Sequence, residues 1–436
     1  MRAVGLLYLA VGIGLAACGG GGRGVESSSD ALAVSEALDA VELAAGCHWF
    51  EVFREGEDYF SLADSSARYW VALGPTQPEP GTRLVAEGVY PNARYFSLHL
   101  YDGNAQSRDA LADVDVDPGQ GFNPYRFPEL IPDALTPGGS YSVAVEFGPA
   151  PLRESRRANT LYRGRLLAAD ARQRRSILMY REYLAQDAPV LPELVVETPS
   201  GQQPLAEVED VAACAGIREE YRRAYLGLDQ AAVGPPRVPA DDPPRMRKFQ
   251  GAIGQGEGAF VNRHVSYLYA LPEYRAGEVL LMRLLAPRVP AEQTLLSPLL
   301  QPAQLRFWSV CQQGLLTAPV AGCVHDVDAA LDANGYATIW ISRADAMPNV
   351  RASALAINSL PWGAEDRGFP VYRHMLPEPR FAQSIQAVNG DDDVESTMQD
   401  YAPRLAQCHA AELDAVGASN SAELFAACEG LAQAQP

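Results

Sequence analysis

Four short strand-like segments occur twice in this chain, in the same order, and this duplication limits the folds that it can adopt. The first copy contains Tyr69–Leu73, Arg94–Leu98, Asn159–Gly164 and Met179–Leu184. The second copy contains Tyr267–Leu271, Arg306–Val310, Asn358–Gly363 and Val371–Leu376. The spacing between the segments differs between the copies, as changes in loop length would produce. We therefore expect two tandem copies of one β-rich domain.

The chain around these segments has the pattern of all-β structure. Its apolar runs are short and rich in Tyr, Phe and Val, and turn residues such as Asp102-Gly103 separate them. Tyr141–Phe147 alternates over the length of one strand, so its odd-numbered residues should share a face. Because no regular helix separates the strands, we predict a mainly β protein with two tandem antiparallel β-sandwich domains of jelly-roll type.

Changes in composition divide the chain into six parts. We expect a signal peptide with a lipobox (1–18), a tether and short helix (19–46), sandwich domain one (47–200), a helix and Pro-rich linker (201–245), sandwich domain two (246–388) and a helical C-terminal hairpin (389–436). Short helices are thus expected at the N-terminus, between the domains and at the C-terminus. Asn420 and Glu423 resemble a capping pair for the last of them.

The N-terminus predicts export and attachment to lipid. An apolar run after Arg2 is too short to span a membrane as a helix, which is the pattern of a secretion signal. The run ends in Leu15-Ala-Ala-Cys18, which resembles a bacterial lipobox, where the cysteine is acylated. We expect acylated Cys18 to hold the protein to the bilayer of the cell envelope, at the outer membrane in a Gram-negative organism. An ordinary signal cut near Ala17 would also export it.

The charge and the cysteine content are consistent with export to the cell envelope. The net charge of −19 argues against a nucleic-acid partner. Seven cysteines less Cys18 leave six, and an exported protein with an even number is expected to form disulfides, here with fifteen alternative pairings. Among these we choose Cys47–Cys214, Cys311–Cys323 and Cys408–Cys428. Scattered cysteines without a CxxC motif disfavour a metal site.

Two groups of side chains are candidates for ligand binding. Asp113, Asp115 and Asp117 fall on one face if their segment is extended, where they could bind Ca²⁺ with further oxygens from a loop. We favour a solvated acidic edge, and therefore expect no cofactor. The aromatic candidates are Trp70, Tyr95, Tyr101, Trp308 and Trp362. If exposed, these rings would form a platform for a sugar or a protein; we favour the alternative, that they lie in the core.

No motif in the sequence assigns a catalytic activity. Gly-x-Ser-x-Gly, HExxH and a phosphate-binding loop are all absent. His325, followed by Asp326 and Asp328, is a minor candidate for metal binding or acid–base chemistry. Two pairs of arginines occupy equivalent positions in the copies: Arg94 with Arg306, and Arg181 with Arg373. We expect each guanidinium to pair with groups of its own domain, because buried charges need partners.

Some of these motifs also carry a resemblance. Tyr90–Ser97, Asp117-Pro-Gly with Asn123-Pro, Arg306–Ser309 and Asn358–Gly363 are similar to uncharacterised secreted bacterial proteins with tandem jelly-roll domains. The resemblance implies that fold for both domains and no activity, because its motifs are turns and strands without chemistry. We expect an envelope lipoprotein that binds a glycan or protein partner through a sandwich face, without catalysis. The alternative is a polysaccharide hydrolase with two carboxylates in a cleft between the domains.

Overall fold

We describe the protein from a computed structural model. The residues that it describes are 47–53, 62–74, 78–126, 139–164, 175–204, 214–219, 221, 249–253, 260–290, 302–314, 320–346, 355–389 and 393–434. The expected signal peptide with Cys18, the tether with its helix and the Pro-rich linker lie outside them. Across these ranges, every helix falls short of the length and apolar content that crossing a membrane requires.

Domain one is a sandwich of two sheets. Its inner sheet has the order β1 (Phe50–Glu51), β2 (Ala67–Leu73), β9 (Ser176–Tyr183), β4 (Tyr95–Asp102) and β5 (Ser107–Ala112). Its outer sheet has the order β11 (Gly201–Pro204), β10 (Glu193–Thr198), β3 (Arg83–Val89), β7 (Gly139–Glu146) and β6 (Gln120–Gly121), with β8 (Thr160–Tyr162) parallel to β7. The pairing of β11 with β10 extends this domain to residue 204.

Domain two repeats this arrangement. Its inner sheet has the order β12 (Gln250–Ile253), β13 (Val265–Tyr269), β19 (Gly368–Pro377), β15 (Leu305–Gly314) and β16 (Val320–His325). Its outer sheet has the order β18 (Ile357–Pro361), β17 (Tyr336–Ser342), β14 (Glu278–Leu285) and β20 (Arg404–His409), and β18 is parallel to β17. The other strand pairs among the described residues are antiparallel, so the predicted mainly β fold of two sandwich domains is confirmed.

The duplication is confirmed down to the register of the strands. Ser97 stands opposite Arg181 in domain one, and Ser309 stands opposite Arg373 in domain two. The same equivalence places β2 on β13, β4 on β15, β9 on β19 and the parallel β8 on β18. All four segment pairs found in the sequence therefore occupy equivalent positions in the fold.

An asparagine explains why the third segment recurs. The side chain of Asn159 accepts a hydrogen bond from the backbone N–H of Asp117 (2.6 Å) and donates one to its carbonyl oxygen (2.7 Å). Asn358 makes the same pair of bonds to Ala330, at 2.8 and 3.0 Å. Each amide thus replaces a missing strand partner, satisfying backbone groups that would otherwise lack one.

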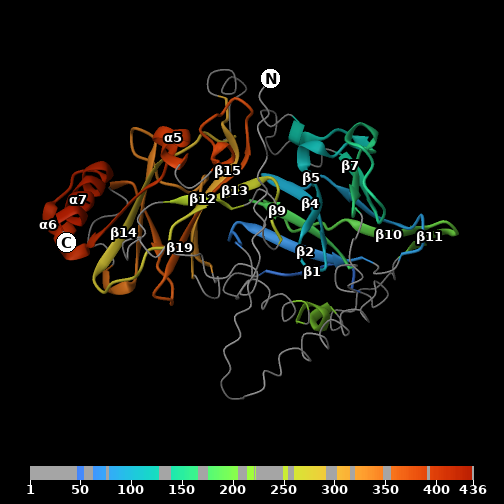
Figure 1. Ribbon diagram of the computed structural model, residues 1–436, viewed down its shortest axis with the longest axis horizontal. Helices are drawn as coiled ribbons and strands as arrows, with labels where there is room; N and C mark the ends of the chain where they lie inside the picture. The colour runs from blue at the N-terminus through green and yellow to red at the C-terminus, as the bar shows by residue number, and fades with distance from the viewer. Residues whose placement is uncertain are drawn as a thin grey trace, which may run out of the picture.

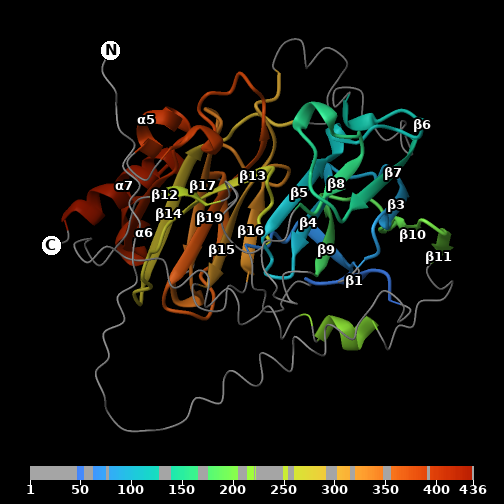
Figure 2. The ribbon, with the colours of Figure 1, turned by 45° about the vertical axis from the view of Figure 1, so that its right-hand side comes forward.

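The inner sheets of the two domains face each other, and their side chains form one shared core. Strand alternation sends Tyr69 and Val71 toward the other domain, while Trp70 points into the sandwich of domain one. The shared core continues with Phe307 and Met375 of domain two. Figures 1 and 2 show the two domains side by side, with α6 and α7 on the far side of domain two.

The C-terminal region differs from the expected helical hairpin. Residues 404–409 form β20, which pairs with β14 and completes the outer sheet of domain two. Leu405 and Ala406 are buried on opposite faces of that sheet, which is the period of a strand. The α-helices described in this region are α5 (Val394–Met398), α6 (Ala410–Val416) and α7 (Ser421–Ala434), and α6 packs against α7.

Short 3-10 helices occur in the connections. They are η2 (Asp113–Asp115), η3 (Pro124–Arg126), η6 (Arg153–Ser155), η7 (Ala344–Ala346), η9 (Ile385–Ala387) and η11 (Gln399–Tyr401). Between the domains, residues 214–219 are helical. The structure contains the three disulfides chosen from the sequence: Cys47–Cys214, Cys311–Cys323 and Cys408–Cys428.

Candidate functional site

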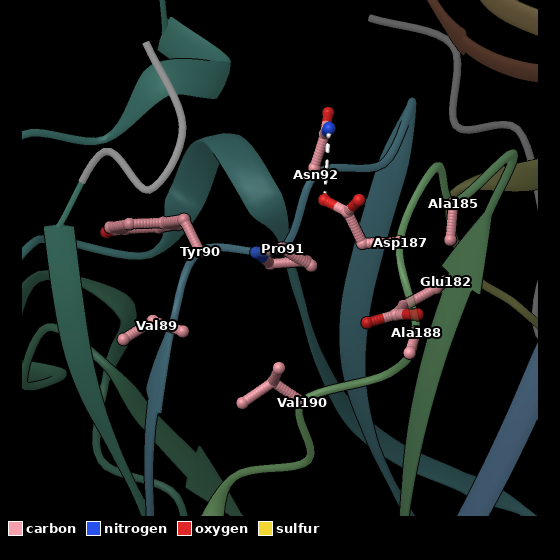
Figure 3. Close-up of a pocket in the computed structure, with 9 residues that line it drawn as sticks. All are labelled: Val89, Tyr90, Pro91, Asn92, Glu182, Ala185, Asp187, Ala188 and Val190. Atoms are coloured by element: carbon pink, nitrogen blue, oxygen red, sulfur yellow. Dashed lines mark hydrogen bonds between the residues drawn. The ribbon is translucent and has the colours of Figure 1, made fainter. Parts of the chain in front are cut away.

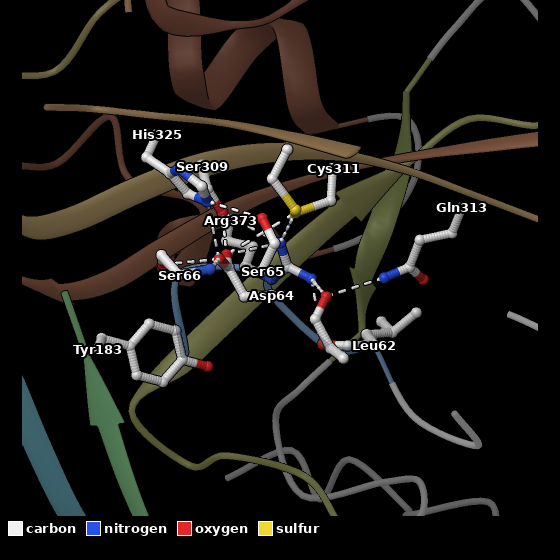
Figure 4. Close-up of a disulfide and its surroundings, with 12 residues drawn as sticks. Leu62, Asp64, Ser65, Ser66, Tyr183, Ser309, Cys311, Gln313, His325 and Arg373 are labelled. Carbon is white, nitrogen blue, oxygen red and sulfur yellow. Dashed lines mark hydrogen bonds and ion pairs between the residues drawn. A yellow bond between two sulfur atoms is a disulfide. The ribbon is translucent and has the colours of Figure 1, made fainter. Parts of the chain in front are cut away.

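A buried polar network lies between the two inner sheets, and Asp64 of domain one is at its centre (Figure 4). Asp64 precedes β2 and has no exposed surface. Its carboxylate accepts hydrogen bonds from the Ser309 hydroxyl (2.5 Å) and from Arg373 Nη1 (2.9 Å), and it lies 3.0 Å from His325 Nε2. All three partners belong to domain two, so the network joins the domains.

The arginines of the network reach across the domain boundary in both directions. Arg373 also donates to the carbonyl oxygens of Leu62 and Ala63, at 3.1 and 2.6 Å. Arg181, its equivalent in domain one, donates to the carbonyl oxygen of Phe260 in domain two (2.9 Å). The expectation that each arginine pairs within its own domain was wrong, because each domain inserts the segment between its first two strands against the inner sheet of the other.

A second reciprocal pair of ion pairs flanks this network. Arg306 Nη1 lies 3.1 Å from Asp113, and Arg94 Nη1 lies 3.6 Å from its equivalent, Asp326. Each arginine also donates to the backbone carbonyl of the other, at 3.4 Å in both cases. This reciprocity is that of an isologous dimer interface, formed here within one chain.

Electrostatics fix the charges of the network. Burial disfavours an ionised Asp64, but the charges of Arg373 and His325 and their hydrogen bonds hold its pKa well below the usual range. Burial lowers the pKa of His325, but the hydrogen bond and the charge of Asp64 raise it, and the net shift is upward. The Ser309 hydroxyl donates a hydrogen bond to Asp64, and the lowered pKa of that carboxylate makes it a poor base for activating a nucleophile. The arrangement suits a structural lock better than nucleophilic catalysis.

The network does not make a metal site. Asp64, Cys323 and His325 bring one ligand atom each within 4.8 Å of one another, the one such group of three or more among the described residues. Cys323 is bonded to Cys311, and a disulfide sulfur does not offer the thiolate that metals prefer. His325 is committed to Asp64 at the same time.

The expected face of three aspartates does not form. Asp113 and Asp115 lie in η2 rather than in an extended strand, so their side chains diverge. Asp113 is buried against Arg306, while Asp117 contacts Arg126 at the surface (2.5 Å). Two of the three carboxylates thus contact separate arginines and Asp115 is exposed, so the Ca²⁺ interpretation is wrong. The favoured solvated acidic edge is also wrong for Asp113, which is buried.

The aromatic platform is also contradicted, and the core alternative is correct. All five candidate rings are buried: Trp70, Tyr95, Tyr101, Trp308 and Trp362. Trp70, Trp308 and Trp362 fill the sandwich cores. The other two lie in the shared core, where the hydroxyl groups contact His264 (2.8 Å) and the carbonyl of Val261 (2.8 Å). Rings of this size are drawn to the packed interior, where their polar atoms find partners.

A surface pocket opens at one end of the domain-one sandwich (Figure 3). It has a volume of about 170 Å³ and is lined by the end of β3, the turn before β4, the end of β9 and the segment after it. The lining residues are Val89, Tyr90, Pro91, Asn92, Glu182, Ala185, Asp187, Ala188 and Val190. Hydrogen bonds from Gln186 N–H to the Asn92 carbonyl (2.9 Å) and from Asn92 Nδ2 to Asp187 Oδ2 (3.2 Å) fix the two walls.

Glu182 is the unusual member of this pocket. It sits in β9 on the face of the sandwich core and is 1% exposed. Its Oε1 accepts a hydrogen bond from the Tyr180 hydroxyl (2.8 Å). Burial raises the pKa of Glu182, against the hydrogen bond from Tyr180 and the charge of Arg68. Figure 3 shows the carboxylate directed toward the space between Pro91 and Val190.

Asp64, Glu182 and Asp187 were not among the residues predicted from the sequence. A signal for Glu182 was present, because Arg181 and Glu182 are adjacent in a strand whose two faces are both buried. Alternation then requires a buried charge on each face. Asp64 and Asp187 lie in loops, where no period reveals which carboxylates are buried or held.

Comparison with known proteins supports the fold alone. Neither the known protein families nor the curated proteins include a match. An uncharacterised protein from Burkholderia cenocepacia is similar in structure, with 14% identity, a TM-score of 0.51 and coverage of 88% of this chain and 87% of that chain. A protein from Vibrio parahaemolyticus has 13% identity, a TM-score of 0.38 and coverage of 81% and 91%. The Burkholderia match is long enough to include both domains.

Replacing Asp64 tests the lock. We expect Asp64→Asn to lower the free energy of unfolding by about 3–5 kcal/mol, because Arg373 would be left buried without its counter-charge. Urea denaturation of the full chain, followed by tryptophan fluorescence, measures this. Asp328→Asn removes a mostly exposed carboxylate near the same histidine and should cost less than about 1 kcal/mol. Equal effects of both variants would contradict the lock.

The pH dependence of stability tests the flanking ion pairs. Burial raises the pKa of Asp113 to about 6, against the charge of Arg306. Its folded pKa then exceeds the unfolded value near 3.9, so its contribution is present below about pH 4 and is lost as pH rises through 6. Asp113→Asn removes that loss. The stability of the variant relative to the wild type should therefore increase from pH 4 to pH 7, by up to about 3 kcal/mol. A pH-independent difference would contradict the raised pKa.

Proposed function

We propose that this protein is a lipid-anchored component of the bacterial cell envelope that binds a partner without catalysis, through the pocket of domain one. The anchor rests on the lipobox-like Leu15–Cys18. The three disulfides favour an oxidising compartment outside the cytosol. The binding role rests on the pocket, which combines exposed apolar side chains at its rim with a buried carboxylate at its floor.

A protein partner has more support than a glycan. Stacking on a sugar needs an exposed ring face, and the five aromatic candidates are buried. Tyr90, the aromatic residue of the pocket, is 1% exposed and donates its hydroxyl to the carbonyl of Val116 (2.9 Å). By contrast, Val89 and Val190 expose 39% and 62% of their surface, and exposed apolar groups favour contact with a protein surface.

The alternative of a polysaccharide hydrolase has less support. It requires two free carboxylates in a cleft between the domains. The described side chains of the facing inner sheets pack against each other there. The carboxylates buried at that boundary, Asp64, Asp113 and Asp326, each pair with an arginine of the other domain.

Metabolic labelling tests the anchor. The full chain, produced in a Gram-negative host with an alkyne analogue of palmitate, should incorporate the label, and Cys18→Ala should lose it because Cys18 is the residue that would carry the lipid. Ser27→Ala, in the expected tether, should label as the wild type does. Equal labelling of Cys18→Ala would contradict the anchor.

Site-specific cross-linking tests the binding role. A photoreactive amino acid is placed at Val190 in the full chain, and the control is the same substitution at Leu152, an exposed residue of domain one that does not line the pocket. Irradiation of whole cells should give a discrete protein adduct at Val190 at several times the yield seen at Leu152. A glycan array with the purified protein tests the other partner class. No adduct specific to Val190, or a specific glycan signal instead, would overturn the proposal of a protein partner.

A further inference from the structure

We propose that the pocket of domain one binds a primary ammonium group carried on an aliphatic stem, with Glu182 as its counter-ion. This inference deepens the proposed function and rests on it for the role of the pocket. The chemistry is that of a lysine side chain on a partner protein or of a free alkyl diamine. It follows from the composition of the walls, the place of the charges and a difference between the two domains.

The walls of the pocket fit an aliphatic stem. Val89, Pro91, Ala185, Ala188 and Val190 supply apolar surface on several sides. The volume of about 170 Å³ is close to the 150 Å³ of an engineered apolar cavity that holds benzene, so a short alkyl chain can enter. A lysine stem buries its methylene groups against such surface while its charged end seeks a polar partner.

The charges of the pocket fit a cation. Its two ionisable carboxyl groups belong to Glu182 and Asp187, and none of its nine lining residues is Lys, Arg or His. The nearby Arg68 donates through Nη1 to the backbone carbonyl of Asp187 (2.8 Å) and does not line the pocket. A buried carboxylate has lost most of its contact with water and is stabilised by an opposite charge. An ammonium group that enters the pocket can therefore form an ion pair with Glu182.

The geometry favours an ammonium over a metal cation. Ca²⁺ takes six to eight oxygen ligands and Mg²⁺ requires near-octahedral oxygens. The pocket is mainly apolar, and Asp187 Oδ2 is held by Asn92. A single buried carboxyl group in a mainly apolar pocket is an environment that suits one ammonium group.

Domain two has no carboxyl group at the position equivalent to Glu182, and η9 packs against the residue there. The fold itself therefore does not require the pocket. The strand equivalence places His374 where Glu182 stands, and Tyr372 where Tyr180 stands. His374 Nε2 lies 2.7 Å from the Tyr372 hydroxyl, and its Nδ1 accepts a hydrogen bond from the N–H of Ile385 in η9 (3.1 Å). In domain one the corresponding space is open and carries a carboxyl group instead.

Titration with small amines tests the inference on the full-length protein. We expect n-butylammonium to bind, as followed by calorimetry and by chemical-shift changes of pocket residues, and n-butanol to bind at least tenfold more weakly. Glu182→Gln keeps the shape and the acceptor for Tyr180 but removes the charge, and should weaken butylammonium binding at least tenfold. Asp115→Asn removes an exposed carboxylate of the same domain outside the pocket and should change it less than twofold.

A second variant keeps the test independent of folding. Val190→Lys, at a position 62% exposed, should compete with the ligand by placing a tethered ammonium at the mouth, with binding lost and thermal stability unchanged. Equal binding of butanol and butylammonium, or unchanged binding in both Glu182→Gln and Val190→Lys, would overturn the inference.

Further experiments distinguish a lysine side chain from a free diamine as the source of the ammonium group. They also distinguish failure of the ammonium site from failure of the proposed partner-binding role. A lysine-containing peptide that binds while its acetyl-lysine form does not identifies a protein side chain; stronger binding of a free diamine identifies a small metabolite. If butylammonium binds but no adduct forms at Val190, the ammonium site stands and the macromolecular partner fails. If an adduct forms while butylammonium does not bind, the partner stands and the ammonium site fails.

Discussion

The ion pair between Asp64 and Arg373 is the constraint on which the arrangement of the two domains depends. Both side chains are fully buried, one from each domain, and neither can be separated from the other without leaving a charge in the interior. Ser309, Leu62 and Ala63 satisfy further atoms of the pair. Since a half-satisfied buried network costs more than an apolar core, the network specifies one docking geometry where apolar packing alone would allow sliding.

The lock also explains why the duplication has not produced two independent domains. Each copy inserts the segment between its first two strands against the other copy. Asp64 and Asn262 begin equivalent turns there, and their side chains accept hydrogen bonds from the backbone N–H groups of Ser66 and His264. Asp64 carries the charge, whereas Asn262 contacts the Tyr95 hydroxyl (3.3 Å). Of the two equivalent insertions, one therefore brings a charged side chain into the interface and the other a neutral one. The domains therefore form one structural unit, and function is left to the surfaces that the lock does not use.

Sequence reasoning succeeded where a repeating pattern carried the information. The paired segments located β2, β4, β8 and β9 and their equivalents, because strand alternation and the turn residues around Asn159 and Asn358 are local signals. It failed at β20, where apolar spacing in a short segment fits a helix or a strand. It failed also for the partners of Arg94 and Arg373, because no local pattern encodes which domain supplies a distant carboxylate. The pocket could not be predicted for the same reason, because its lining residues come from two segments, 89–92 and 182–190, that are far apart in the sequence.

Comparison of the two domains distinguishes buried polar residues that the shared fold requires from those that occur in one domain alone. The buried arginines, the asparagine clamps and the reciprocal ion pairs occur in both domains, so the shared architecture requires them. Glu182 has no such counterpart, since His374 takes its place with hydrogen bonds to Tyr372 and Ile385. A buried carboxyl group costs stability unless something repays its desolvation. Domain two shows that the fold does not need a carboxyl group here. The hydrogen bond from Tyr180 and the charge of Arg68 offset part of the cost in domain one, and a cationic ligand would offset more of it.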